Sequence, residues 1–498
     1  MKLERTSGIL LHPTSLPNSP LCGSFGHPAR AWLNELASSG IGVWQFLPLA
    51  PTDSMGSPYS SPSSFALNPW FLDQDDLLKE GFLGKKIEKF SSENDCFDSR
   101  LNFTLASSKE KILRSYLVDN WDKQKGTFQE QFEIWCSSQF WLDDHSIFME
   151  LKIQNNDLPW WDWPEKYALR DKKELGNWKR ENKRELLGHN LVQWHLDRQW
   201  KLIRKLAKKL GISLFGDVPF YVSKDSADVW SNRSLFSILT NSNTYLQSGV
   251  PPDYFSETGQ LWGNPVYRWS RHKASNYRWW RKRISRHLEQ VDFLRLDHFR
   301  ALEAFWAIPG KDKTAENGFW LPSPGRDILR LIKKDCSGSL PLVAEDLGLI
   351  TSKVEKLRDD FELAGMKILQ FAFDGNLSNP YLPENIKDEN WIVYTGTHDN
   401  STSQGWWKDM DKERQEQVKE RFHDCDNFTP WELIRIGMET KAKLFVAPMQ
   451  DLLNLGNNSR LNKPGTIDNN WSWRLSKNDL NIKEVLNRYG HLAKRHNR

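Results

Sequence analysis

Short apolar runs that end in polar or charged residues recur along most of the chain. We predict eight strands from these runs, at residues 8–13, 41–49, 212–219, 293–299, 340–346, 366–374, 391–400 and 443–451. The segments between the strands have helical spacing. It is clearest at 192–210, where apolar residues recur at helical intervals: Leu196, Trp200, Ile203, Ala207 and Leu210. Strands that alternate with helices in this way predict an α/β fold, a (β/α)8 TIM barrel with helical insertions between barrel strands.

The regular alternation is interrupted at two places. Residues 70–191 are charged, rich in Trp and helical in composition, so we predict a mainly helical insertion subdomain there. Residues 1–69 would then form the first part of the barrel, and 192–498 the remainder of the catalytic barrel. The second interruption, 249–267, is rich in Pro and Gly, and we expect it to be an irregular active-site loop without a regular element.

Acidic residues stand at the C-terminal ends of several predicted strands, which is where TIM barrels place their active sites. These residues are Asp217, Asp297, Glu345, Asp374 and Asp399. Carboxylates that converge on one buried mouth are costly unless they are paired or take part in chemistry. Asp217 and Asp374 could instead be turn or cap residues.

Arg295 and Asp297 are alternate residues of one predicted strand, so their side chains should point to the same face. The positive charge would lower the pKa of Asp297 and keep it ionised, as a nucleophile must be. The apolar residues before Glu345 should raise its pKa and suit it to donate a proton. From these residues alone, a purely structural ion pair explains Arg295 and Asp297 equally well.

Several acids in one aromatic-lined cleft are typical of two chemistries. One is the binding of Mg²⁺ or Ca²⁺ by oxygen ligands, and the other is cleavage of a glycosidic bond by two carboxyl groups. The metal interpretation is weaker, because the chain has no Asp-rich loop of the calcium-binding kind. The 25 Trp residues could pack in the core or stack on sugars, and composition does not separate these uses.

Charge and cysteine content narrow the classes of protein further. A net charge of +4 against 68 basic and 64 acidic residues gives no overall field for nucleic acid. Residues 276–286 interleave basic and aromatic side chains, but we expect a helix with a basic outer face that covers the barrel. The five Cys are scattered without C-x-x-C spacing, which fits a reducing compartment. With no visible signal peptide or long apolar run, we expect a soluble cytoplasmic protein without a membrane partner.

Long motifs in a fixed order resemble glycoside hydrolase family 77, the 4-alpha-glucanotransferases. The similar segments are 8–17, 56–59, 216–221, 251–255, 261–265, 295–300, 344–348, 396–400, 462–465 and 470–474. The resemblance runs nearly from end to end, with no departure at the catalytic positions. It gives no residue roles for the helical insertion.

The resemblance implies a role for ten residues. Its catalytic residues would be the nucleophile Asp297, the general acid/base Glu345 and the transition-state stabiliser Asp399. Its substrate-binding residues would be Tyr59, Asp217, Tyr254, Phe255, Trp262, Arg295 and His398, with Tyr254 and Phe255 on a lid. It implies no cofactor, no metal and a retaining double displacement through a covalent glucosyl-enzyme, with the two carboxyl groups about 5 to 5.5 Å apart.

The expected partners are α-1,4-glucan donors and acceptors such as maltooligosaccharides, glucose and amylose, with no nucleic acid and no obligate protein partner. Two alternatives remain open at this point. One is an α-1,4-glucan hydrolase that uses the same three acids, and the other is a non-catalytic carbohydrate-binding protein. His12 and His298 could be packed polar residues of the barrel mouth. We expect residues 462–474 to brace the barrel rim, without a chemical role.

Overall fold

The centre of the molecule is a parallel β-barrel. The computed structural model describes residues 4–19, 21–84, 100–252, 256–422, 428–476 and 481–498. Its eight-stranded sheet has the order β10-β11-β12-β1-β2-β3-β6-β9. The strand bounds are β1 Thr6–Leu10, β2 Val43–Gln45, β3 Ser213–Val218, β6 Phe293–Leu296, β9 Leu342–Ala344, β10 Gly365–Ile368, β11 Trp391–Tyr394 and β12 Leu444–Pro448. A parallel bridge between Val343 and Ala364 brings β9 beside β10 and nearly closes the sheet.

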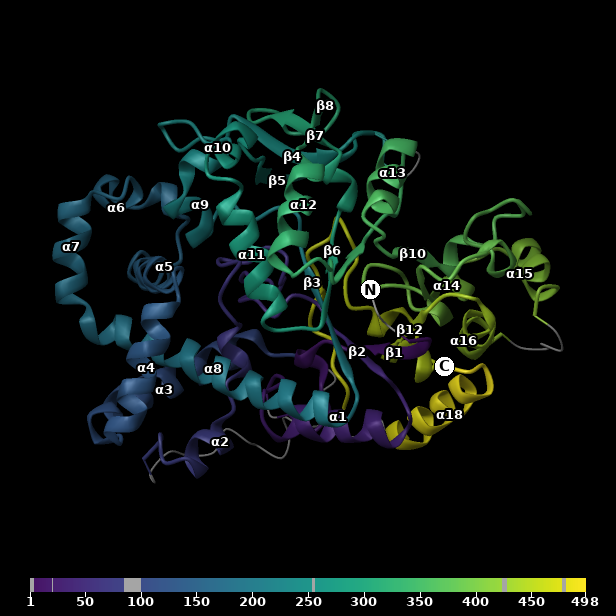
Figure 1. Cartoon of the computed structure of the whole chain (residues 1–498), viewed down its shortest axis with the longest axis horizontal. Helices are drawn as coiled ribbons and strands as arrows, with labels where there is room; N and C mark the ends of the chain where they lie inside the picture. The colour runs from purple at the N-terminus through teal and green to yellow at the C-terminus, as the bar shows by residue number, and fades with distance from the viewer. Residues whose placement is uncertain (1–3, 20, 85–99, 253–255, 423–427, 477–480) are drawn as a thin grey trace.

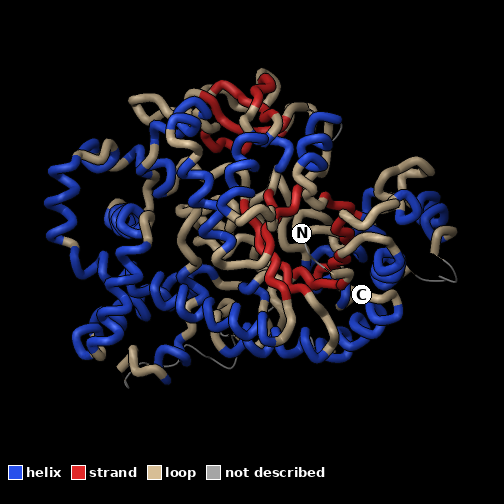
Figure 2. Tube along the Cα trace, viewed as in Figure 1, coloured by secondary structure: helices blue, strands red, loops and turns tan. Residues whose placement is uncertain are grey.

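This sheet confirms the predicted TIM barrel and all eight predicted strands. Figure 2 shows its strands gathered at the centre of the molecule. The observed strands end earlier than predicted, so Asp297, Glu345 and Asp399 lie just beyond them. The reason is that loops at the C-terminal end of a barrel leave the hydrogen-bonded ladder to form the site.

Helices surround the barrel. The longer ones are α1 His27–Ser38, α8 Lys183–Lys209, α11 Arg278–Leu288, α12 Gly325–Asp335, α13 Ser352–Asp360, α16 Pro430–Glu439 and α18 Ile482–Arg495. The shorter ones are α9 Ala227–Ser231, α10 Trp269–Ala274, α14 Ser403–Lys408, α15 Lys412–Lys419 and α17 Met449–Leu452. The helix expected at 192–210 is α8, which begins earlier than predicted, so residue 191 lies inside it rather than before it. None of the helices in the described ranges is long and apolar enough to cross a membrane.

Between β2 and β3 the chain forms a group of helices that extends to one side of the barrel, at the left of Figure 1. These helices are α2 Gln74–Lys79, α3 Phe103–Asp119, α4 Gly126–Ser138, α5 Leu142–Gln154, α6 Glu165–Ala168 and α7 Lys172–Glu181. Several of their Trp side chains and those of the connecting turns are buried: Trp135, Trp141, Trp160, Trp163 and Trp178. The Trp-rich composition of this region therefore serves packing.

A second, antiparallel sheet has the order β5-β4-β7-β8. Its strands are β4 Leu246–Val250, β5 Gln260–Pro265, β7 Ala304–Pro309 and β8 Phe319–Pro322. The prediction that 249–267 contains no regular element is wrong, because β5 lies within it. Pro265 is tolerated because it ends an edge strand, and Gly263 adopts φ 74° where the pairing of β4 with β5 is irregular.

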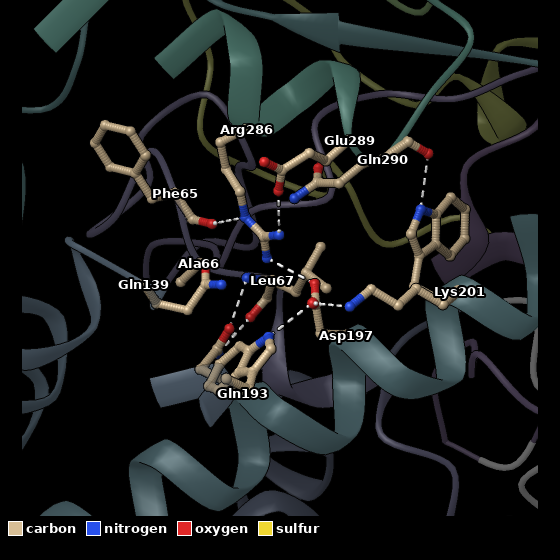
Figure 3. A network of polar contacts seen from close by, with 12 residues as sticks. Phe65, Ala66, Leu67, Gln139, Gln193, Asp197, Lys201, Arg286, Glu289 and Gln290 are labelled. Carbon is tan, nitrogen blue, oxygen red and sulfur yellow. Dashed lines mark hydrogen bonds and ion pairs between the residues drawn. The ribbon is translucent and has the colours of Figure 1, made fainter. Parts of the chain in front are cut away.

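The helix predicted around 276–286 forms as α11, with Arg278 and Lys282 exposed on its outer face. The prediction did not include Arg283 and Arg286 on its inner side, where both are buried. Arg283 donates to the Phe220 carbonyl oxygen at 3.0 Å, and Arg286 pairs with Asp197 of α8 at 2.9 Å. Figure 3 shows the network around Asp197, which joins α8 to α11 and to the loop after β2. Buried Arg residues are stable here because acceptors surround them.

Candidate active site

A buried guanidinium joins two carboxylates at the C-terminal end of the barrel. Asp217 of β3 and Arg295 of β6 lie opposite each other in register. Arg295 donates from Nη1 to Asp217 Oδ2 and from Nη2 to Asp297 Oδ1, each at 2.5 Å. The Asp217 side chain is 1% exposed and that of Asp297 is 29% exposed. Asp297 is therefore the carboxylate of this group that is open to a substrate, and Asp217 is not a simple cap.

The pKa of Asp297 shifts in the direction opposite to the prediction. Burial raises the pKa of Asp297 above its ordinary value, the positive charge of Arg295 opposes that rise, and the charges of Asp217 and Asp399 add to it. The predicted effect of Arg295 exists, but burial outweighs it, so the net shift is upward rather than downward. The contributions of Asp217 and Asp399 also indicate that these acids share one site.

Glu345 follows β9 and faces the same site. Its Oε2 accepts the His298 backbone N–H at 2.8 Å, and its Oε1 accepts the Leu347 N–H at 3.0 Å. Burial, followed by the negative charge of Asp297, raises the pKa of Glu345 to about 8. This confirms the raised pKa expected for a proton donor. Glu345 therefore keeps its proton at neutral pH, which suits it to protonate a leaving group.

The residue after Asp297 turns the backbone toward Glu345. His298 has φ 51° and ψ 46°, in the left-handed region that residues other than Gly seldom occupy. This turn directs its N–H to Glu345. Its ring lies edge-on to Trp262, with ring centroids 4.8 Å apart, and Trp262 is 37% exposed. The sequence predicts no role for His298 in the site, because the spacing of residues does not reveal which backbone N–H groups act as donors.

Tyr59, His398 and Asp399 lie next to one another, and Tyr59 connects them to Asp217. The Tyr59 hydroxyl donates to Asp217 Oδ2 at 2.7 Å, and its ring stacks on His398 with centroids 5.2 Å apart. His398 Nε2 lies 3.3 Å from Asp399 Oδ2, and the Asp399 side chain is 42% exposed. Four acids, one guanidinium and two aromatic rings thus meet at the barrel mouth.

Sequence reasoning also gave no chemical role to residues near Asn462. The Asn462 side chain donates from Nδ2 to Asp399 Oδ1 at 2.6 Å, and Arg460 donates to the Asp399 backbone oxygen. The signal in the sequence was the Asn462–Gly465 motif itself, but nothing in its spacing indicates which carboxylate it meets.

The remaining predicted residues do not contribute described contacts to the site. Asp374 is exposed, and its Oδ1 accepts the Asn376 N–H at 2.9 Å, so it is the turn residue that was the alternative. Tyr254 and Phe255 lie outside the described residues. Within the described ranges, no group of three or more His, Cys, Asp or Glu side chains could hold a metal ion.

Two neighbouring carboxyl groups, one of them bound by a guanidinium, beside a third acid and sugar-sized aromatic surfaces, can cleave and re-form a glycosidic bond. Comparison with known proteins agrees with this chemistry. A family model for glycoside hydrolase family 77, described as 4-alpha-glucanotransferase, matches residues 11–480.

Characterised relatives match over nearly the whole chain. The 4-alpha-glucanotransferase of Synechocystis sp. is 40% identical, over 96% of this chain and 95% of its own. That of Thermus thermophilus is 39% identical, over 96% of each. The solved amylomaltase from Streptococcus agalactiae in complex with acarbose has a TM-score of 0.93 and 33% identity, covering 99% of this chain and all of its own. Nothing in these comparisons favours the hydrolase or the non-catalytic alternative. The chain therefore belongs to glycoside hydrolase family 77 and is an enzyme of the 4-alpha-glucanotransferase (amylomaltase) type.

Proposed function

We propose that Asp297, Glu345 and Asp399 perform the glucan transfer of this family by a retaining double displacement. The observation that carries this assignment is the contrast between two neighbouring carboxyl groups. Arg295 binds Asp297, whereas Glu345 is buried with a pKa raised to about 8. A nucleophile must be ionised and a general acid protonated. The charge of Arg295 favours the ionised form of Asp297 against the upward shift of its pKa by burial, whereas burial keeps the proton on Glu345.

In the first displacement, Asp297 attacks C1 of an α-1,4-linked glucan and forms an ester bond to it. Because Arg295 holds Oδ1, we assign the attack to Oδ2. The bond between C1 and the 4-oxygen of the leaving glucan breaks, and Glu345 gives that oxygen its proton. The product is a covalent glucosyl-enzyme together with a shortened glucan.

In the second displacement, the 4-hydroxyl of another glucan or of glucose attacks C1. Glu345, now ionised, takes the hydroxyl proton, and the ester bond to Asp297 breaks. Asp399, beside His398, would hold ring hydroxyls and stabilise the positive charge that develops on the sugar in both steps.

Binding of the sugar would use the residues around these acids. Tyr59, Asp217, Arg295 and His398 form one connected group that could hold hydroxyls. Trp262 is exposed enough to stack on a sugar face. Tyr254 and Phe255 stay predicted lid residues.

We further propose maltooligosaccharides, glucose and amylose as donors and acceptors. The names of the relatives support α-glucan transfer, and the amylomaltase from Streptococcus agalactiae was solved with acarbose. Action without a cofactor, a metal, nucleic acid or an obligate protein partner stays a prediction, as does a cytoplasmic location.

Incubation with maltotriose, with analysis of all products, tests the proposal. Transfer gives glucose together with maltopentaose and longer chains, whereas hydrolysis gives maltose and glucose without longer chains. Asp297→Asn should lose nearly all turnover while keeping the thermal midpoint. Near-wild-type turnover of that variant would show that the mechanism is wrong.

The segment between β4 and β5 is the part we expect to favour transfer over hydrolysis. It contains the predicted lid residues Tyr254 and Phe255, and we expect it to exclude water while an acceptor binds. Shortening residues 251–259 without changing the three acids should raise the ratio of hydrolysis to transfer from maltotriose. An unchanged ratio would remove this segment from the explanation.

A further inference from the structure

A segment from the far end of the chain reaches the loop that carries Asp399. Arg460, Leu461 and Asn462, hereafter the 460–462 segment, follow β12 and α17 in the chain. The Asn462 N–H donates to the His398 carbonyl oxygen at 3.1 Å, and its side-chain Nδ2 donates to Asp399 Oδ1 at 2.6 Å. Asn462 thus binds both the backbone and the carboxylate of a loop that lies 63 residues away in sequence.

Arg460 also connects the loop that carries Asp399 to the backbone of Asn462. Its guanidinium donates to the Asp399 backbone oxygen, to Ser401 Oγ at 3.3 Å and to the Asn462 carbonyl oxygen at 2.7 Å. One side chain therefore fixes the Asp399 loop and the backbone of Asn462 relative to each other. Arg does this better than Lys because its donors have a fixed planar arrangement.

The 460–462 segment is itself held on its other side. The Trp471 N–H donates to the Leu461 carbonyl oxygen at 2.7 Å. Two residues further on, the Trp473 carbonyl oxygen accepts the Ser15 hydroxyl at 2.8 Å. The segment therefore has a rigid support that starts from the loop after β1.

Asp399 needs such support more than the other acids do. It lies beyond the end of β11, and its side chain is 42% exposed, so packing does not fix its carboxylate. Its two oxygens are held from opposite sides, with Oδ1 on Asn462 and Oδ2 near His398. The N–H donor of Asn462 at 2.6 Å fixes the direction of Oδ1.

We infer that Asn462 is a positioning residue for glucan transfer, which aims the Asp399 carboxylate at the sugar, with Arg460 fixing both loops. This inference rests on the role proposed above for Asp399. It gives residues 460–462 a part in the chemistry beyond bracing the barrel rim. A carboxylate that must stabilise a developing positive charge is effective only when its direction is fixed in advance.

The charged and titratable groups that face Asp399 come from four parts of the chain. They are His398 on its own loop, Arg460 on the 460–462 segment, Asp297 after β6 and Tyr59 after β2. Replacing Asn462 by Asp keeps the size of the side chain, removes the donor and adds a second negative charge beside Asp399. The added charge should repel the Asp399 carboxylate and turn it from the direction that Asn462 gives it.

The test compares Asn462→Asp, Asn462→Ala and Asn458→Asp, with transfer from maltotriose measured between pH 4.5 and 8. Asn458 is an exposed residue shortly before the 460–462 segment, so its variant adds the same charge without touching Asp399. For Asn462→Asp we expect kcat to fall about tenfold or more, with KM changed less than about threefold. For Asn462→Ala we expect kcat to fall about tenfold with KM changed less than about threefold. Asn458→Asp should resemble the wild type.

A KM that rises about as far as kcat falls in the Asn462 variants would overturn the inference, because a general loosening of the site would act in that way. So would an Asn462→Ala variant whose kcat stays within about twofold of the wild type. The thermal midpoints of the variants show whether a loss of activity comes from unfolding. If Asn462→Asp does not fold, the result for Asn462→Ala decides the test. Asp399→Asn is measured in parallel. If that variant stays active, the proposed role of Asp399 fails; if it is inactive while the Asn462 variants are normal, only the inference fails.

Discussion

At the scale of single residues, Glu345 should determine how the enzyme responds to alkaline pH. Burial and the negative charge of Asp297 raise its pKa to about 8, so its proton is present below that pH and lost above it. Because the first displacement needs that proton, kcat/KM for maltotriose should fall as pH rises through about 8. Rates measured from pH 5 to 10 check this. A kcat/KM that stays level up to pH 10 would assign the proton to another group.

Arg295 should not be replaceable by Lys, although the charge is the same. Its two nitrogens reach Asp217 and Asp297 together, which one ammonium group cannot do. We expect Arg295→Lys to lower kcat about 100-fold or more, by analogy with other preorganised electrostatic groups. The matched control is Arg281→Lys. Arg281 also uses two nitrogens, each at 2.6 Å, but both bind the single carboxylate of Asp335 on the surface. Equal kcat in the two variants would contradict the assignment.

At the scale of elements, the contact between α8 and α11 depends on a buried ion pair. Asp197 and Arg286 lie 2.9 Å apart with side chains that are 7% and 5% exposed (Figure 3). Asp197→Ala would leave Arg286 buried with only the exposed Glu289 as a carboxylate partner and should lower the free energy of unfolding by about 3 kcal/mol. Asp327→Ala, which breaks an exposed pair with Arg330, should cost less than about 1 kcal/mol. Urea unfolding of both variants measures the difference, and equal values would show that the buried pair is unimportant.

The barrel strands were predictable and the second sheet was not, for a physical reason. Strands buried on both faces, such as β11 and β12, are continuous apolar runs. Strand β5 is a partly exposed edge strand that contains Gly263 and ends at Pro265, a composition that sequence reasoning assigns to a loop. Its existence depends on pairing with β4, which no local pattern reports.

The candidate site, like the fold, could be predicted from the sequence only in part. The acids could be found because each follows an apolar run, as Asp297 follows β6. The backbone donor of His298 and the contact of Asn462 with Asp399 could not be found in this way. The first depends on a left-handed backbone angle and the second on a tertiary contact across 63 residues. Helix α11 shows that a charged residue cannot be assumed to be exposed. Two of its Arg residues are buried against acceptors that come from other elements.

At the scale of the whole molecule, buried neutral His residues should make the fold sensitive to acid. Burial lowers the pKa of His12, His145 and His287 to about 3. Their folded-state pKa lies below the unfolded value near 6.5, so their contribution to stability is present above about pH 6.5 and is lost as pH falls toward 3. At pH 5 each should cost about 2 kcal/mol of unfolding free energy.

Urea unfolding at pH 7.5 and pH 5 measures this loss. His145→Gln should reduce the difference between the two pH values, whereas His491→Gln, at an exposed position of α18, should leave it unchanged. Equal stability of the wild type at both pH values would contradict the prediction.

The most direct test of the central claim is to identify the residue that becomes covalently glycosylated. In Glu345→Gln, α-maltosyl fluoride can still react because fluoride leaves without a proton, but the second displacement has lost its base. Acid quenching, proteolysis and mass spectrometry should then find a maltosyl group on Asp297. A maltosyl group on another carboxylate, or no covalent adduct while fluoride is released, would contradict a double displacement through Asp297.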